Sequence, residues 1–208
     1  MKKISKLYNG LPVEELLFKY NLALQKIETE LSVLIKDYEH KHNSKPVDHI
    51  KTRLKTQESI LKKLNKKNYE PTNENIIKHV HDVIGIRIVC TFLSDVYEIV
   101  ELIRNSNSFR IKEEKDYIKS PKDTGYISYH IILEVPISLD KEKGYFEAEV
   151  QIRTMAMDFW ASLEHKISYK IDKIPEEIRQ EMINCALDIR ALDEKMFKIN
   201  EITKKYRR

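Results

Sequence analysis

Polar side chains that could do chemistry alternate along residues 146–154, which read FEAEVQIRT. This alternation predicts a strand with one buried face, because successive side chains of a strand point to opposite sides. The other face carries two carboxylates, a carboxamide and a guanidinium along about 13 Å. Such a set suits a metal ion and a polar substrate, although an ordinary solvated sheet face is the alternative for a single strand. These polar residues are Glu147, Glu149, Gln151 and Arg153.

Another carboxylate, Asp82, precedes a run rich in Ile and Val that predicts a buried strand over residues 83–92. A carboxylate at the edge of a strand is well placed to ligate Mg²⁺, and Gly85 permits close approach of other groups to the backbone. Regular alternation would put Asp82 and Arg87 on opposite faces. Either Asp82 precedes the regular strand, or a bulge lies at Gly85. We interpret His79 and His81 as structural.

A basic stripe is expected on a helix that begins between residues 47 and 53 and ends at Leu64. Ammonium groups beside a hydroxyl suit a polyphosphate, while a solvated lysine-rich face is the commoner alternative. Arg53 lies off this stripe, near the start of the helix, and would have to act differently. The stripe consists of Lys55, Ser59, Lys62, Lys63 and Lys66.

The loop over residues 119–125, with Pro121 and Gly125, leads into a strand over residues 128–135. Lys122 offers a phosphate contact and Tyr126 a face for stacking on a base. A turn with a core tyrosine is an equally good interpretation of this loop alone. Together with the carboxylates and the lysines, it indicates a metal-dependent nucleotide-transfer site.

Two long helices with heptad patterns flank these motifs. We expect these helices over residues 12–42 and 175–205, where they pack on the rest of the chain or form a subunit interface. The apolar positions of the first pattern are Val13, Leu17, Tyr20, Leu24, Ile27, Leu31, Leu34 and Tyr38. Those of the second are Ile178, Met182, Cys185, Ile189, Leu192, Met196 and Ile199.

The intervening chain predicts short elements joined by turns. We expect a polar connector over 65–73, a helix over 95–105, a strand over 109–117 and a turn at Lys143–Gly144. Thr154 can N-cap a helix through Ile167, with Phe159, Trp160 and Leu163 as its packing residues.

The composition predicts one domain over residues 1–208. With 37 basic and 33 acidic residues, the chain lacks the strong positive field of a dedicated nucleic-acid binder, so an anion site must be local. Cys90 and Cys185 lie in apolar patterns and are expected to be buried free thiols. No signal peptide or sufficiently long apolar run is seen, which favours a cytoplasmic protein.

Four ordered segments, RLKTQESILKKL, HDVIGIRIVCTF, KDTGYISYH and EVQIRTMAMDFWASLEHKISYK, closely resemble the small alarmone synthetases. These are single-domain relatives of the RelA/SpoT enzymes, and the resemblance covers about residues 47–170. It implies an α+β fold with a nucleotidyltransferase-like mixed sheet flanked by helices. It also implies Mg²⁺-dependent transfer of pyrophosphate from ATP to the 3′-hydroxyl of GTP or GDP, which yields (p)ppGpp and AMP.

The resemblance implies a role for each matching residue. Asp82 resembles the Mg²⁺ ligand, and Glu149 the second carboxylate, which binds metal or activates the hydroxyl. Arg53 and Arg87 would enclose adenine. The ATP phosphates would be held by Lys55, Ser59, Lys63 and Lys66, and the acceptor guanosine nucleotide by Lys115, Lys122, Tyr126, His130, Gln151 and Asp158.

The resemblance also has limits. Ile127 stands where many relatives carry a basic or polar residue, which affects the expected acceptor. The chain has no room for the hydrolase and regulatory domains of the long relatives, so synthesis without hydrolysis is expected. Small members of the family are typically homotetramers.

Two other functions are considered. One is a toxin-type relative that pyrophosphorylates tRNA 3′ ends, which the weak net charge disfavours. The other is a catalytically silent module that binds RNA or a partner through the basic tail of Lys204, Lys205, Arg207 and Arg208.

Overall fold

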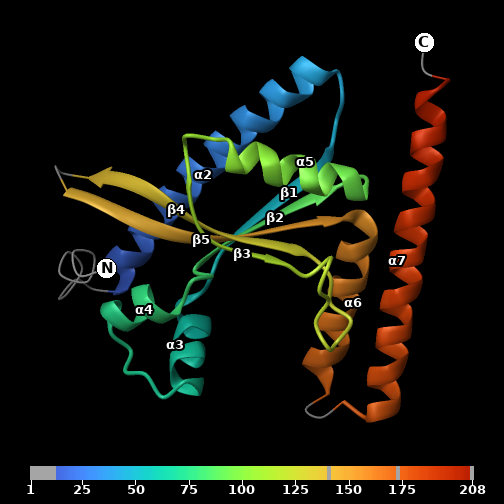
Figure 1. The fold of residues 1–208 in the computed structure, drawn as a ribbon. Helices are drawn as coiled ribbons and strands as arrows, with labels where there is room; N and C mark the ends of the chain where they lie inside the picture. Colours follow the sequence, from blue (N-terminus) through green and yellow to red (C-terminus); the bar gives the residue numbers. More distant parts are fainter. Residues whose placement is uncertain (1–12, 140–141, 172–173, 207–208) are drawn as a thin grey trace.

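A five-stranded mixed sheet with the strand order β1-β2-β5-β4-β3 forms the centre of the chain (Figure 1). The computed structural model describes residues 13–139, 142–171 and 174–206. Strands β2 and β5 are parallel, and the other neighbours are antiparallel. The strands are β1 (Val47–Leu54), β2 (Ile84–Cys90), β3 (Arg110–Asp116), β4 (Tyr129–Leu139) and β5 (Glu142–Thr154).

Helices cover one face of this sheet and flank its ends (Figure 1). Helices α2 and α5 lie over one face, α3 and α4 lie near one end of β2, and α6 and α7 lie at the other end. None of the described helices combines the length and apolar character needed to cross a bilayer. The helices are α2 (Val13–His42), α3 (Gln57–Lys66), α4 (Asn73–His79), α5 (Leu93–Arg104), α6 (Met155–Lys170) and α7 (Glu176–Lys204). The predicted α+β class is therefore confirmed.

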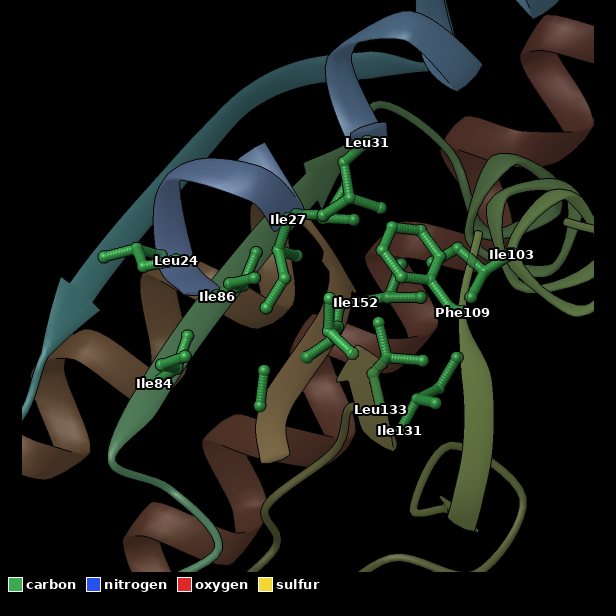
Figure 2. Packing of buried hydrophobic residues seen from close by; sticks show 14 of the residues in the cluster. Leu24, Ile27, Leu31, Ile84, Ile86, Ile103, Phe109, Ile131, Leu133 and Ile152 are labelled. Atoms are coloured by element: carbon green, nitrogen blue, oxygen red, sulfur yellow. The ribbon is translucent and has the colours of Figure 1, made fainter. Parts of the chain in front are cut away.

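The core lies between α2, α5 and the covered face of the sheet (Figure 2). Ile27 and Leu31 of α2 pack toward Ile86 and Ile152, which belong to β2 and β5, and Leu24 belongs to the same cluster on the side of β1. The alternation predicted for residues 146–154 holds, since every second side chain of this stretch is buried on that face. The first heptad pattern thus packs on the chain's own sheet, and the polar side chains of the strands are left on the opposite face.

The helix predicted from residues 47–53 to Leu64 is wrong in its first half. Residues 47–54 form β1, in which exposed and half-buried side chains alternate, and Arg53 pairs with Gly85 across the neighbouring strand. Helix α3 begins only after Thr56, whose hydroxyl accepts a hydrogen bond from Ser59 N. Val47, Ile50 and Leu54 fall at the three- and four-residue spacing of a helix, which led to a helical interpretation of what is a strand.

Two local predictions are also wrong, and one helix was not predicted. The predicted connector over 65–73 is present between α3, which ends at Lys66, and α4, the helix that was not predicted and that Thr72 caps. Lys143 and Gly144 are paired within the β4–β5 hairpin, and the hairpin connection at 140–141 is outside the described residues. Cys185 is exposed, whereas Cys90 is buried as expected.

The inward face of α7 differs from the predicted heptad face. Ala186 and Asp193 are buried, and Met182 and Ile189 are partly buried. Four of the predicted positions, Ile178, Leu192, Met196 and Ile199, are 38–51% exposed. On α6, Thr154 is the N-cap as predicted and Trp160 is buried, but Phe159 and Leu163 are 60% and 42% exposed.

Candidate active site

Two rows of side chains cross the uncovered face of the sheet. Because register partners share a face, each row can be followed from strand to strand. The first row has Arg53 on β1, Gly85 on β2 and Glu149 on β5. The second has a member on all five strands: Lys51, Arg87, Gln151, His130 and Lys115. The sheet thus brings together residues from distant parts of the sequence.

A cavity of about 270 Å³ lies over β1 and β2. The Arg53 side chain lies across Gly85, since a Cβ added at Gly85 would be 3.0 Å from Arg53 Nε. Among the described residues, the Nε of Arg87 is a buried donor without an acceptor. Two guanidinium groups here can face a planar or anionic ligand. The cavity is lined by Lys51, Thr52, Arg53, Gly85, Ile86, Arg87, Glu149 and Gln151.

A second cavity, of about 200 Å³, extends over β4 and β3. It is bounded by both predicted catalytic carboxylates, Asp82 and Glu149. Glu149 also lines the first cavity, so it stands on the wall common to both. The lining consists of Lys63, His81, Asp82, Glu113, Glu114, Lys115, Tyr117, Lys122, His130, Ile132 and Glu149.

Asp82 is held by two lysines. It lies before the start of β2, so the alternative of a bulge at Gly85 is not needed. Lys55 Nζ donates to Asp82 Oδ2 and Lys63 Nζ to Oδ1, each at 2.7 Å. Burial favours the protonated form, but the two hydrogen bonds outweigh it and lower the pKa of Asp82 to about 2. Asp82 is therefore fully ionised at neutral pH.

Glu149 is held by two neighbours from the second row. Gln151 Nε2 donates to Glu149 Oε2 at 2.9 Å, and His130 Nδ1 lies 3.3 Å from Oε1. Burial would raise the pKa of Glu149, but its contacts with His130 and Gln151 prevail and lower the pKa. An ionised carboxylate in this position can accept a hydrogen bond from a substrate hydroxyl.

The buried Arg153 orients the groups around Glu149. Its side chain is 2% exposed and donates to Gln151 Oε1 at 2.5 Å and to the Tyr126 hydroxyl at 2.7 Å. The Tyr126 hydroxyl can then donate to His130 Nε2, 2.8 Å away, which leaves the ring proton on Nδ1 toward Glu149. Two hydrogen-bonded routes from Arg153 converge on one carboxylate.

Asp158 contacts Arg87 and Arg153 and lines neither cavity. Its Oδ1 is 3.1 Å from Arg87 Nη1 and 3.5 Å from Arg153 Nη1. It belongs to the first turn of α6, where a carboxylate is favoured by the helix dipole. The residue predicted to contact the acceptor thus bridges Arg87 and Arg153.

Three predicted ATP-binding positions differ from the expected stripe. Lys55 precedes α3, yet it converges with Lys63 on Asp82. Ser59 accepts a hydrogen bond from Thr56 and lines neither cavity. Lys66 lies exposed in the last turn of α3, also outside both linings, because only one face of a short helix can meet the sheet.

Of the six predicted acceptor residues, Lys115, Lys122 and His130 line the second cavity. Gln151 lines the first cavity, and Tyr126 and Asp158 line neither. The ammonium of Lys115 contacts Glu113 at 2.7 Å. Lys122 Nζ lies 4.6 Å and 4.9 Å from the ring centres of Tyr117 and Tyr126. Ile127, expected beside the acceptor, is instead 3% exposed and packs in the core, so it presents nothing to this cavity.

Some lining residues were missed from the sequence. Lys51 shares one face of β1 with Arg53, and Thr52 alternates with both, a period-two signal that was interpreted as helical. Tyr117 follows β3 directly and carried no distinguishing pattern. Glu147, interpreted as an ordinary sheet residue, forms an ion pair with Lys112 and is hydrogen-bonded to His81.

Asp82 and Glu149, the predicted metal ligands, are two of the four carboxylates that line the second cavity. Within the described residues, no group of three or more His, Cys, Asp or Glu side chains is arranged to hold a metal. Mg²⁺, however, is commonly held by one or two carboxylates together with substrate phosphates and water. Asp82 and Glu149, with lysines beside them, fit that mode.

Residues 52–174 match the family described as "Region found in RelA / SpoT proteins". GTP pyrophosphokinase YwaC of Bacillus subtilis (strain 168) is 42% identical over 89% of both chains. The structure of small alarmone synthetase 2 from Bacillus subtilis is similar with a TM-score of 0.81 and 40% identity, over 90% of this chain and 97% of that one.

Small alarmone synthetase 1 from Bacillus subtilis, bound to its product pppGpp, matches with a TM-score of 0.82 and 30% identity. That match covers 90% of this chain and 96% of the other. The chain therefore belongs to the RelA/SpoT family, among its small alarmone synthetases. The resemblance seen in the four sequence segments is confirmed.

Proposed function

We propose that this chain is a GTP diphosphokinase, which transfers pyrophosphate from ATP to the 3′-hydroxyl of GTP or GDP and so makes (p)ppGpp for stringent-response signalling. The observation that carries this proposal is the position of Glu149 on the wall shared by two cavities. A carboxylate between a bound donor and a bound acceptor is well placed to activate the attacking hydroxyl. The names of the relatives support the same reaction.

On the donor side, Arg53 and Arg87 enclose the adenine over the first cavity, since a guanidinium plane stacks well on an aromatic base. Lys55 and Lys63 hold the phosphates beside Asp82. Asp82 and Glu149 would hold Mg²⁺, which supplies positive charge to the phosphates when it is bound. Ser59 and Lys66 are left outside this group.

On the acceptor side, Lys115 and Lys122 contact the phosphates of the guanosine nucleotide and Tyr126 stacks on guanine. Glu149 accepts a hydrogen bond from the 3′-hydroxyl and takes its proton as the new oxygen–phosphorus bond forms. The bond between the β-phosphorus and the α,β-bridging oxygen breaks, and AMP leaves. His130 and Gln151 keep Glu149 oriented during this step.

The reaction is tested with ATP labelled at the γ-phosphate and with GTP, GDP or GMP, the products being separated by thin-layer chromatography. We expect labelled guanosine products from wild type and none from Glu149→Gln. Glu134→Gln is the matched control, because Glu134 lies on β4, pairs with Arg110 at 3.5 Å and lines neither cavity. Absence of product with every acceptor would refute the proposal.

The same labelled ATP tests the toxin-type alternative when tRNA replaces the guanosine nucleotide. Label in RNA would favour that alternative. The silent binding module would be favoured by ATP binding without turnover under any acceptor. Its tail residues Arg207 and Arg208 lie outside the described residues.

We also propose that the chain forms a homo-oligomer, a tetramer in its simplest form, and that it acts in the cytoplasm, where its nucleotide substrates occur. An apolar groove of about 600 Å³ between α6 and α7 supports association, together with the exposed Leu192, Met196 and Ile199. Light scattering after size-exclusion chromatography tests this. We expect Leu192→Lys to lower the molar mass of the assembly.

A further inference from the structure

The loop that joins β3 to β4 rests on the C-terminal helix. In Figure 1 this loop lies next to α6, and α6 packs on α7. A Cβ added at Gly125 would be 2.9 Å from Ala186 Cβ and 3.3 Å from Ile183 Cα, both on α7. Gly125 also has a φ of +86°, which favours glycine. The loop therefore meets α7 at a contact that has no spare room.

This contact lies one residue from a predicted acceptor-binding side chain. The loop is a closed turn, in which Gly125 N donates to Lys122 O at 2.8 Å and Lys122 N donates to Tyr126 O at 3.1 Å. Tyr126 packs on the small cluster formed by Trp160, Ala161 and Ala186. A displacement of Gly125 must therefore also move the backbone of Tyr126 and Lys122.

Helix α7 is itself fixed on both sides of this contact. Trp160 Nε1 donates to Met182 O at 3.0 Å, one turn before Ala186. Thr154 Oγ1 donates to the buried Asp193 Oδ2 at 2.5 Å, two turns after it. Since Thr154 also caps α6, the hydrogen bond joins α7 to the end of β5, next to Arg153. The helix has a defined position relative to the sheet.

We propose that Ala186 is a positioning residue for the acceptor nucleotide, through which α7 holds the Lys122–Tyr126 loop in its binding position. Among the described residues, none of α7 lines either cavity of the candidate active site. Ala186 therefore acts on acceptor binding only indirectly, through the loop. It affects the acceptor and not ATP, because the Lys122–Tyr126 loop bears proposed acceptor contacts and no proposed ATP contacts. This inference rests on the proposed function for the identity of the acceptor.

The test enlarges this one side chain. Ala186→Leu has no room against Gly125, whereas Ala191→Leu makes the same change at an exposed position of the same helix. We expect Ala186→Leu to raise KM for GTP or GDP at least tenfold and to leave KM for ATP within about twofold. Ala191→Leu should change neither. Size-exclusion chromatography must show the same oligomeric state for each protein compared.

A spectroscopic readout is independent of turnover. Trp160 is the single tryptophan of the chain and lies beside the contact, with Cζ2 3.5 Å from a Cβ added at Gly125. We expect its emission maximum to shift in Ala186→Leu and to stay unchanged in Ala191→Leu. If Ala186→Leu does not fold, the pair Ala186→Gly and Ala191→Gly replaces it, with a smaller rise in acceptor KM expected only for the first.

Equal changes in KM for both substrates, or no change in a folded Ala186→Leu protein with shifted Trp160 emission, would overturn the inference. Should wild type give no product, the proposed function fails by itself. Calorimetric binding of GDP and of a non-hydrolysable ATP analogue to the same variants then decides the inference. Selective loss of GDP affinity in Ala186→Leu supports it, and unchanged GDP affinity refutes it.

Discussion

Replacing Asp82 by asparagine tests the charge arrangement at the second cavity. The carboxylate is 17% exposed and accepts hydrogen bonds from Lys55 and Lys63. Asp82→Asn keeps the size of the side chain but leaves two ammonium groups facing each other without an anion. The pKa of Asp82 is lowered from 3.8 to about 2. A pKa shift of one unit corresponds to about 1.4 kcal/mol. Ionised Asp82 therefore contributes about 2 kcal/mol to the free energy of unfolding.

The sign of the pH dependence follows from the lowered pKa. The contribution of Asp82 is fully present above 3.8, the ordinary value that we assign to the unfolded chain, and is lost as the pH falls through about 2. The difference in free energy of unfolding between wild type and Asp82→Asn should thus be constant from about pH 5 to pH 8 and shrink below about pH 4. At neutral pH the variant should melt about 4–8 °C lower.

The assay is urea unfolding followed by Trp160 fluorescence in buffer with EDTA, at a series of pH values. Asp37→Asn is the matched control, since Asp37 forms an exposed ion pair with Lys41 on α2 and should contribute less than about 1 kcal/mol. Under the proposed function, Asp82→Asn also loses product formation and Asp37→Asn keeps it. Equal stability of wild type and Asp82→Asn at pH 7 would refute the electrostatic reasoning.

Three further changes test other parts of the structure. Arg153→Met removes a buried guanidinium that orients its neighbours, so we expect the free energy of unfolding to fall by about 3 kcal/mol in urea titrations and product formation to drop at least tenfold. Burial raises the pKa of Asp193, so ionisation of this carboxyl opposes folding. Relative to Asp193→Asn, the wild-type melting temperature should therefore decrease as the pH rises above the ordinary aspartate pKa of 3.8, which thermal melts at a series of pH values measure. Lys63→Ala should raise KM for ATP at least tenfold, and Lys66→Ala should leave it within about twofold; an equal effect of both would restore the lysine stripe predicted from the sequence.

Strands whose polar and apolar side chains alternate along the chain could be predicted from the sequence alone. Period-two alternation placed Glu149, Gln151 and Arg153 on one face of β5, and this needs only the geometry of an extended chain. The same holds for β4 and for the start of α6 at Thr154, whose hydroxyl accepts from Met157 N. The family resemblance was likewise carried by residue types in sequence order.

The tertiary structure decided which residues meet. Lys55 and Lys63 come from different elements and converge on Asp82 only because β1, α3 and the turn before β2 are adjacent in space. The sequence could not show that residues 47–54 pair with β2, because strand pairing is a long-range interaction and a charged strand resembles an amphipathic helix over a few residues.

Residues 146–154, taken by themselves, have a polar face that could have been solvated. In the folded chain the polar side chains of this strand have different surroundings. Arg153 is buried and orients its neighbours, and Glu149 faces two cavities. Glu147 contacts His81 and Lys112. Ile127, which was expected beside the acceptor, lies in the core. Residue types were readable from the sequence, whereas burial and partners depend on contacts between segments far apart in it.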